Sequence, residues 1–427
     1  MNWLTIPKKL TFLSRKAKNL LVSLYAIRKC PYLIWTILIV EAIAVVLIQQ
    51  PWRSPDSTLY LELAQNLSGP GFVADGSPNS LRVPAYPWFL NLMLFRLGLP
   101  TAVVIGLQML LYLASIWLIA YKVMAPTHRL PFLCLAMIYP FPFFYSATLM
   151  TEALAIFCVA VVVALLCNSK TIPGFALAGA VTGLGALIRT DILPILIAVV
   201  AVAAYRRRLA GTGAAIVATF VVLLPYMVWN QQTFGRFTPV PISSTIGQSL
   251  YLASWESTLE LEDLVYLSGG LVTNRAERSG FAPEVRRLHG SEEFKAAAIE
   301  RIRANPMDAV AHSVKAVWRL FNTASYPRLN PVFQIISNGV WLLGVVGMIL
   351  AVRKRRPLIP LILLLAMLIP HMPLHTEARY TAPLRLILLL YAAIAVASAR
   401  MRVPVAANAS AGQGVTSLGA VDSRPDP

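Results

Sequence analysis

The sequences PDSTLY (residues 55–60) and LRVPAYP (residues 81–87) bound the stretch of chain that decides the fold. The stretch includes Asp56 and Arg82, and it directly follows a hydrophobic run that is preceded by a basic N-terminus. A polar loop that emerges from a first membrane span, with carboxylates, an arginine and prolines beside aromatic rings, suits a site at the membrane surface. The stretch therefore predicts a membrane protein with chemistry at one face of the bilayer.

Apolar runs recur along the whole chain. Of its 427 residues, 57% are hydrophobic and 13% are charged, whereas soluble domains carry about 25% charged residues. A helix of about 20 apolar residues crosses the hydrocarbon core, and in lipid the backbone must bond internally. We therefore predict an all-α polytopic membrane protein with about ten transmembrane helices. The expected spans are 33–50, 101–121, 130–147, 152–168, 172–190, 191–205, 211–229, 331–351, 357–371 and 381–398.

The net charge is +18, and the positions of the basic residues along the chain agree with this topology. Lysine and arginine gather in short segments between the spans, and all these segments fall on one side of the membrane if the N-terminus is cytoplasmic, as the positive-inside rule demands. Most acidic residues fall on the other side. The basic segments suit anionic lipid, and nucleic-acid binding is not expected. The four cysteines lie in or beside spans, so the outer loops have no disulfide framework.

Three parts are expected. Residues 1–30 form a basic cytoplasmic or interfacial N-terminus without a cleavage site. Residues 31–398 form the transmembrane domain, with an outer loop at 51–100 that carries the candidate catalytic acid and an outer segment at 230–330. Residues 399–427 are expected to form a disordered cytoplasmic tail.

Local signals predict helices outside the spans. Tyr86 to Leu97 resembles a helix in the membrane interface. Ser291 and Asn305-Pro306 each open a further helix, and the second of these carries Val314 and Trp318 along one side, so we expect it to lie on the bilayer.

Two acids are candidates for catalysis. At the water–lipid boundary, the carboxylate of Asp56 can take a proton from an acceptor hydroxyl; the alternative is a helix cap or turn aspartate. Glu152 is predicted at the outer start of a span, where an acid favours the helix dipole; alternatively it is a second carboxylate that faces Asp56 and orients an acceptor or a metal ion. Glu41 is the one acid expected inside a span, as a proton relay or a buried neutral carboxyl.

Arginines near the outer ends of spans are candidate clamps for a lipid phosphate. Arg189 has this position, although it could instead pair with Asp191. Arg379 has it too, with Tyr380 as a hydrogen-bonding neighbour, and Arg82 from the first outer loop completes the expected phosphate-binding set.

A metal site is a weaker alternative for the turn before Arg379. His371, His375 and Glu377 could bind a cation there, but no motif fixes their geometry, and a solvated loop is the favoured interpretation. Whether a divalent cation takes part in the chemistry is left open.

Short motifs in a fixed order resemble the polytopic GT-C glycosyltransferases, in particular the family 39-like group that includes protein mannosyltransferases and the aminoarabinose transferase. The resemblance covers roughly residues 35–395. The motifs are Asp56-Ser57 with Tyr60, Gly69-Pro70-Gly71-Phe72, Arg82-Val83-Pro84-Ala85-Tyr86-Pro87, Tyr145-Ser146, Thr151-Glu152-Ala153-Leu154, Leu187-Ile188-Arg189, Trp229-Asn230, Phe234-Gly235-Arg236-Phe237-Thr238-Pro239 and Arg379-Tyr380-Thr381-Ala382-Pro383.

The resemblance implies a polyprenyl-phosphate sugar as donor and transfer outside the cytoplasm. It assigns the catalytic base to Asp56 and maps two family arginines onto Arg189 and Arg379, the second followed by Tyr380. Many relatives have Asp-Glu where this chain has Asp56-Ser57, and no large C-terminal domain is expected in this chain. Metal dependence and recognition of the acceptor therefore do not carry over.

The predicted function is an inverting membrane glycosyltransferase of the bacterial cytoplasmic membrane, with its site facing the periplasm or exterior and a lipid, glycan or protein as acceptor. The alternatives are a flippase or secondary transporter for lipid-linked sugars, and a polysaccharide polymerase or ligase. Convergence of Asp56, Glu152 and Arg189 in one outward cavity would favour the enzyme, and their scatter would favour the transporter.

Overall fold

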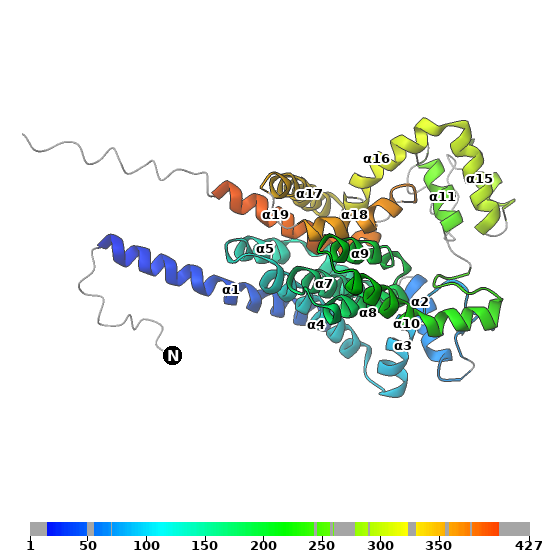
Figure 1. The fold of residues 1–427 in the computed structure, drawn as a ribbon, viewed down its shortest axis with the longest axis horizontal. Coiled ribbons are helices and arrows are strands. Elements are labelled where there is room, and N and C mark those ends of the chain that lie inside the picture. Colours follow the sequence, from blue (N-terminus) through cyan, green and yellow to red (C-terminus); the bar gives the residue numbers. More distant parts are fainter. Residues whose placement is uncertain are drawn as a thin grey trace, which may run out of the picture.

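The computed structural model describes residues 15–48, 55–69, 71–242, 246–256, 259, 278–288, 291–322, 330–354, 358–375 and 378–400. The fold is a bundle of helices that lie roughly along one direction, with a smaller group of helices at one end (Figure 1). In the described ranges the strands are limited to β1 (Val73–Ala74) and β2 (Ser77–Pro78). The predicted all-α fold is confirmed.

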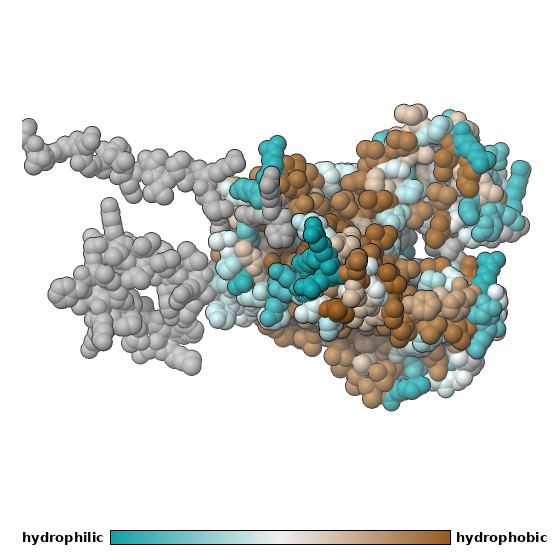
Figure 2. All heavy atoms as spheres, viewed as in Figure 1, coloured by the Kyte–Doolittle hydropathy of each residue, from teal (hydrophilic) through white to brown (hydrophobic). Residues whose placement is uncertain are grey.

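The bundle helices coincide with the predicted spans. Among the described residues, four helical stretches are long and apolar enough to cross a bilayer, and five shorter apolar helices accompany them. Hydrophobic residues cover much of the face shown in Figure 2. The bundle helices are α1 (Arg15–Ile48), α4 (Thr101–Leu118), α5 (Pro126–Ile138), α6 (Pro140–Ser146), α7 (Glu152–Asn168), α8 (Ile172–Ile188), α9 (Ile195–Tyr205), α10 (Leu209–Phe234), α17 (Asn330–Arg353), α18 (Ile359–His371) and α19 (Arg385–Arg400).

One detail of the prediction is wrong. The span expected at 130–147 consists of two helices, α5 and α6, which part at Tyr139. Pro140 disfavours helical backbone at the residue before it, and a proline is well placed in the first turn of a new helix. Helix α1 runs without a break from Arg15 into the first span. Residues 1–14 and 401–427 lie outside the described ranges.

The remaining elements lie between the bundle helices or beyond their ends. The helices expected at Tyr86–Leu97, from Ser291 and from Asn305-Pro306 are all present. These elements are α2 (Pro55–Asn66), α3 (Ala85–Leu90), the π-helices η2 (Asn91–Arg96) and η3 (Ile119–Val123), the 3₁₀ turns η4 (Thr190–Ile192) and η7 (Ala378–Leu384), α11 (Ile246–Trp255), α14 (Phe281–Val285), α15 (Ser291–Ala304) and α16 (Pro306–Asn322).

Small residues allow a close contact between α8 and α10. A Cβ atom on Gly179 would lie 2.2 Å from the carbonyl oxygen of Ala215, and one on Gly183 would lie 2.9 Å from that of Thr219. The Thr219 hydroxyl donates to the Gly179 carbonyl at 2.8 Å across the same contact. Spacing of small residues by four is typical of packed membrane helices. It fixes α8 against α10, and thereby the end of α8 at Arg189.

The bundle has two chemically different ends. The start of α1 and the end of α19 lie at one end, whereas α2, α3, α11 and α15 lie at the other (Figure 1). Asp56, Glu152 and Arg189 all stand where helices begin or end at this second end. Residues far apart in the sequence are thus brought together by the packing of the helices that carry them.

Candidate active site

A cavity of about 320 Å³ opens where these helix ends meet. The backbone explains how the side chains reach it: Asp56 is in the first turn of α2, Glu152 begins α7, and Arg189 is the extended residue that ends α8. All the residues predicted for the site line this one cavity, namely Asp56, Arg82, Glu152, Arg189, Arg379 and Tyr380.

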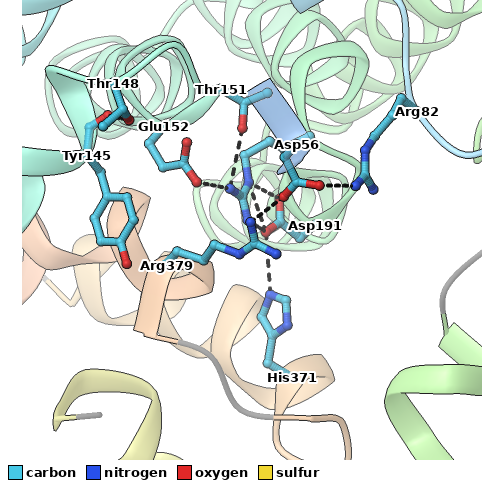
Figure 3. A network of polar contacts seen from close by, with 10 residues as sticks. Asp56, Arg82, Tyr145, Thr148, Thr151, Glu152, Asp191, His371 and Arg379 are labelled. Carbon is cyan, nitrogen blue, oxygen red and sulfur yellow. Dashed lines mark hydrogen bonds and ion pairs between the residues drawn. The ribbon is translucent and has the colours of Figure 1, made fainter. Parts of the chain in front are cut away.

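Asp56 is held between two guanidinium groups (Figure 3). Nη2 of Arg82 lies 2.5 Å from Oδ1, and Nη1 of Arg379 donates to Oδ2. Burial raises the pKa of the Asp56 carboxyl, but the charges and hydrogen bonds of Arg379 and Arg82 outweigh burial and hold the pKa below its ordinary value. Both oxygens of the carboxylate are therefore occupied, and Asp56 is ionised and a weak base in this arrangement.

A second ion pair lies deeper in the cavity wall. Nη1 of Arg189 donates to Oε1 of Glu152 at 2.9 Å, and Nη2 donates to Oδ2 of Asp191 at 2.8 Å. The Glu152 side chain is fully buried, and its Oε2 has no hydrogen-bond partner among the described residues. The buried Glu152 and the partly buried Asp191 thus share the Arg189 guanidinium. Glu152 begins α7, as one of the two interpretations of the sequence has it, and its salt bridge is to Arg189 in a wall of the same cavity.

His371 is a cavity residue that sequence reasoning considered only as a metal ligand. Its Nε2 lies 3.7 Å from Oδ2 of Asp191, and its ring stacks on Tyr380 with a centroid distance of 5.7 Å and an interplanar angle of 9°. The Arg379 guanidinium lies 5.6 Å from the centroid of the Tyr380 ring. The aromatic rings of His371 and Tyr380 therefore form a platform beside Arg379.

A buried polar chain supports the turn before Glu152. The Tyr86 hydroxyl donates to Oε1 of Gln108 at 3.0 Å, and Nε2 of Gln108 donates to the carbonyls of Ser146 and Thr148. Sequence reasoning missed this role of Gln108. A fully buried glutamine in the apolar helix α4 is the signal that could have suggested it, because buried amides need partners.

No group of three or more His, Cys, Asp or Glu side chains is placed to hold a metal ion in the part of the chain that the structure describes. The suggested set in the turn is not brought together: His371 lies beside Asp191, whereas Nδ1 of His375 lies 2.5 Å from Oε1 of Glu256. Glu377 lies outside the described residues.

The charges that line the cavity are balanced. Its three carboxylates, Asp56, Glu152 and Asp191, face the guanidiniums of Arg82, Arg189 and Arg379. Arg82 and Arg379 are the more accessible cations, with 27% and 24% of their side chains exposed, against 12% for Arg189. An entering anion would therefore meet Arg82 and Arg379 first, and it would compete with Asp56 for both.

Known proteins match the chain in part. Residues 86–268 match the model of Glycosyltransferase family 87. ArnT from Cupriavidus metallidurans is similar in structure: the form bound to undecaprenyl phosphate aligns with a TM-score of 0.39 and 13% identity over 85% of this chain and 77% of ArnT. The apo form gives a TM-score of 0.39 and 11% identity over 84% and 77%. No curated protein sequence matches.

The match to the family 87 model covers less than half of the chain and supports the resemblance to a GT-C membrane glycosyltransferase, although the matching family is 87 and not the family 39-like group. With its apolar helices, the chain is an integral membrane protein. The matched range contains Glu152, Arg189 and Asp191, whereas Asp56, Arg82 and Arg379 lie outside it. The cavity therefore joins residues from the matched range to residues from both sides of it.

Proposed function

We propose that this protein is an inverting membrane glycosyltransferase that moves a sugar from a polyprenyl-phosphate donor to an acceptor outside the cytoplasm. The observation that carries the proposal is the convergence of Asp56 with Arg82 and Arg379 in one cavity at the end of a membrane bundle. Such a cavity offers what the reaction needs, namely a carboxylate beside cations that suit a phosphate. The family 87 match supports the reaction class.

In the first step the donor phosphate would displace the Asp56 carboxylate from Arg82 and Arg379. A planar guanidinium binds phosphate oxygens in the same forked geometry in which it binds a carboxylate. Loss of these contacts would raise the pKa of Asp56, because they are what holds the pKa down. Donor binding would thus turn a weakly basic carboxylate into a competent base, with Tyr380 beside the phosphate.

In the second step the acceptor hydroxyl attacks the anomeric carbon on the face opposite the phosphate. Its oxygen forms the new glycosidic bond, its proton passes to Asp56, and the bond between the anomeric carbon and the phosphate oxygen breaks with its electron pair going to polyprenyl phosphate. Arg82, Arg379 and Arg189 stabilise the charge that grows on the leaving oxygen, which is electrostatic stabilisation by groups already in place. Glu152 holds Arg189 in position. One displacement inverts the anomeric centre.

The distribution of charge supports a site on the outer face. Lys122 and Arg206 lie beside the end of α7 that is opposite Glu152, because the Asn168 amide donates to the Lys122 carbonyl and Arg206 donates to the Ser169 carbonyl. By the positive-inside rule that end faces the cytoplasm. The cavity would then open to the periplasm or exterior of a bacterial cytoplasmic membrane, where a lipid-linked donor can reach it from the outer leaflet.

A deletion strain tests the proposal. Mass spectrometry of its envelope glycolipids and glycoproteins should reveal a species that has lost one sugar, and the wild-type gene should restore that sugar. The variant Asp56→Asn should reach the membrane but restore nothing, because loss of a general base lowers the rate by about 10²–10⁴-fold. Full restoration by Asp56→Asn would refute the base, and an unchanged envelope in the deletion strain would refute the transferase.

A further inference from the structure

Helix α16 carries an apolar stripe that the described residues of the protein leave exposed. Met307, Val310, Val314 and Trp318 are 74%, 56%, 65% and 45% exposed. Their spacing of three, four and four residues places them along one side of the helix. Exposed large apolar residues in a row mark a surface that meets another apolar phase.

The other sides of α16 are either buried or charged. His312, Ala316 and Leu320 are buried, and they lie on the side roughly opposite the stripe. Asp308 and Lys315 are exposed and lie between these two sides. The helix therefore has one side against the protein, one apolar side that is open and a charged edge between them, which is the pattern of a helix in a membrane interface.

Continuity with a membrane span indicates what covers the stripe. The next described helix, α17, contains a stretch long and apolar enough to cross a bilayer, and its first turns expose Val332 at 63% and Ile335 at 73%. Helix α16 packs against α17, and in Figure 1 it runs from the bundle out toward α15. A lipid surface that surrounds the start of α17 therefore reaches the neighbouring α16.

We propose that α16 docks on the outer leaflet through this stripe, with Asp308 and Lys315 at the water side. The partner is the lipid bilayer and not a second copy of the chain or another protein. The proposal stands on exposure and helix geometry and does not depend on the proposed glycosyl transfer.

The same helix is bonded to the segment that enters the cavity. The His312 ring lies 3.1 Å from the Leu374 carbonyl, and the Thr381 hydroxyl donates to the Leu320 carbonyl at 2.6 Å. Arg379 and Tyr380 lie between these two attachment points. Docking of α16 on lipid would thus fix the height of Arg379 above the membrane surface; this consequence, unlike the docking itself, rests on the proposed function.

Photocrosslinking tests the docking. The full chain carrying p-benzoylphenylalanine at Val314, or at Lys315 as the matched control one residue away, is placed in vesicles of equal parts phosphatidylethanolamine and phosphatidylglycerol and irradiated. Mass spectrometry of the protein should show a lipid adduct at position 314 and several-fold less at position 315. Crosslinked dimers at 314, equal lipid adducts at both positions, or no lipid adduct would each overturn the proposal.

A pair of variants tests the consequence for the cavity. Val314→Glu should lower sugar transfer in vesicles several-fold, whereas Lys315→Glu should leave it unchanged. Gel filtration in detergent should show that both variants are folded. If the lipid adduct forms but Val314→Glu transfers sugar at the normal rate, the docking stands and its link to Arg379 is wrong. If wild-type protein transfers no sugar at all, the failure lies in the proposed function and the crosslinking result is unaffected.

Discussion

Two clusters of charged side chains lie at the same end of the molecule, and they differ in what holds their carboxylates. In the cavity, Asp56 and Glu152 are held by arginines alone. In the second cluster, Glu256 is held by Arg319 at 3.1 Å, His375 at 2.5 Å and His312 at 3.5 Å. Arginine keeps its charge at every accessible pH, whereas histidine changes charge near neutrality.

The clusters also differ in access. Asp56 lines the cavity with 21% of its side chain exposed, whereas Glu256 is 5% exposed and does not line it. Glu256 instead ties α11 to α16 and to His375, in the turn after α18. The first cluster is placed to bind and react, and the second to hold the wall of the cavity. Substitutions in the two clusters test this assignment of roles.

The largest effect is expected for Arg189→Met. The change leaves Glu152 and Asp191 buried without their shared cation, which costs about 3–5 kcal/mol when one partner of a buried ion pair is removed. We expect a large fall in the unfolding temperature in detergent, measured by differential scanning fluorimetry. Arg82→Met is the matched control, because Asp56 keeps Arg379 and is partly exposed; its unfolding temperature should change little while its affinity for the donor falls.

A triple variant separates charge from packing at the same place. Arg189→Met together with Glu152→Gln and Asp191→Asn removes both the cation and the anions that need it. Its unfolding temperature should recover toward that of the wild type, since a buried ion pair replaced as a whole by neutral groups often costs little. Recovery of sugar transfer in the triple variant would contradict the role of Arg189 at the phosphate.

A smaller effect, on stability alone, is expected for Glu256→Gln. The amide keeps the shape of the side chain but loses the charge that pairs with Arg319 and the histidines, and a disrupted buried polar group costs about 1–3 kcal/mol. The midpoint of unfolding should fall, while the rate of transfer per folded molecule should stay near that of the wild type. A loss of transfer as complete as that of Asp56→Asn, with normal stability, would erase the distinction between the two clusters.

Parts of this comparison were predictable from sequence, and parts were not. Charged residues at the ends of apolar runs stand out, so Asp56, Glu152 and Arg189 could be chosen and their convergence anticipated. Which carboxylate meets which arginine could not be predicted, because Asp56 and Arg379 are 323 residues apart and helix packing alone brings them together. The Glu256 cluster was missed for the same reason.

The fold was easier to predict than the site. Hydrophobic runs specify membrane helices directly, since the bilayer leaves few other ways to satisfy the backbone. Tyr139, where the run at 130–147 breaks, was missed because hydropathy measures how apolar a run is and not whether its backbone continues.

His312 of the second cluster should contribute to the pH dependence of stability. Burial lowers the pKa of His312 below its ordinary value of 6.5, against the opposing pull of Glu256. The unfolded chain then binds a proton that the folded chain does not, so stability should fall as the pH drops below 6.5, by up to about 1.4 kcal/mol per pH unit for one group. Asp56 has a lowered pKa, so its contribution is present above 3.8 and is lost only at still lower pH.

Thermal unfolding in detergent between about pH 7 and about pH 5 measures this effect. His312→Gln is the matched variant, because its amide can still donate to the Leu374 carbonyl but does not titrate. Its unfolding temperature should depend less steeply on pH than that of the wild type. An equally steep dependence in His312→Gln would show that His312 is not the responsible group.

The smallest effect is expected at Tyr380, and it decides how this residue serves the cavity. The sequence suggested its hydroxyl as a hydrogen-bonding neighbour of the phosphate clamp, but in the structure its ring stacks on His371 and lies 5.6 Å from the Arg379 guanidinium. If the ring is what matters, Tyr380→Phe keeps both contacts, and the KM for the donor should stay within about twofold of the wild type. Tyr380→Leu removes the cation–π contact, worth about 0.5–1 kcal/mol, and should raise that KM by about two- to fivefold. A loss in Tyr380→Phe as large as that in Tyr380→Leu would instead assign the contribution to the hydroxyl.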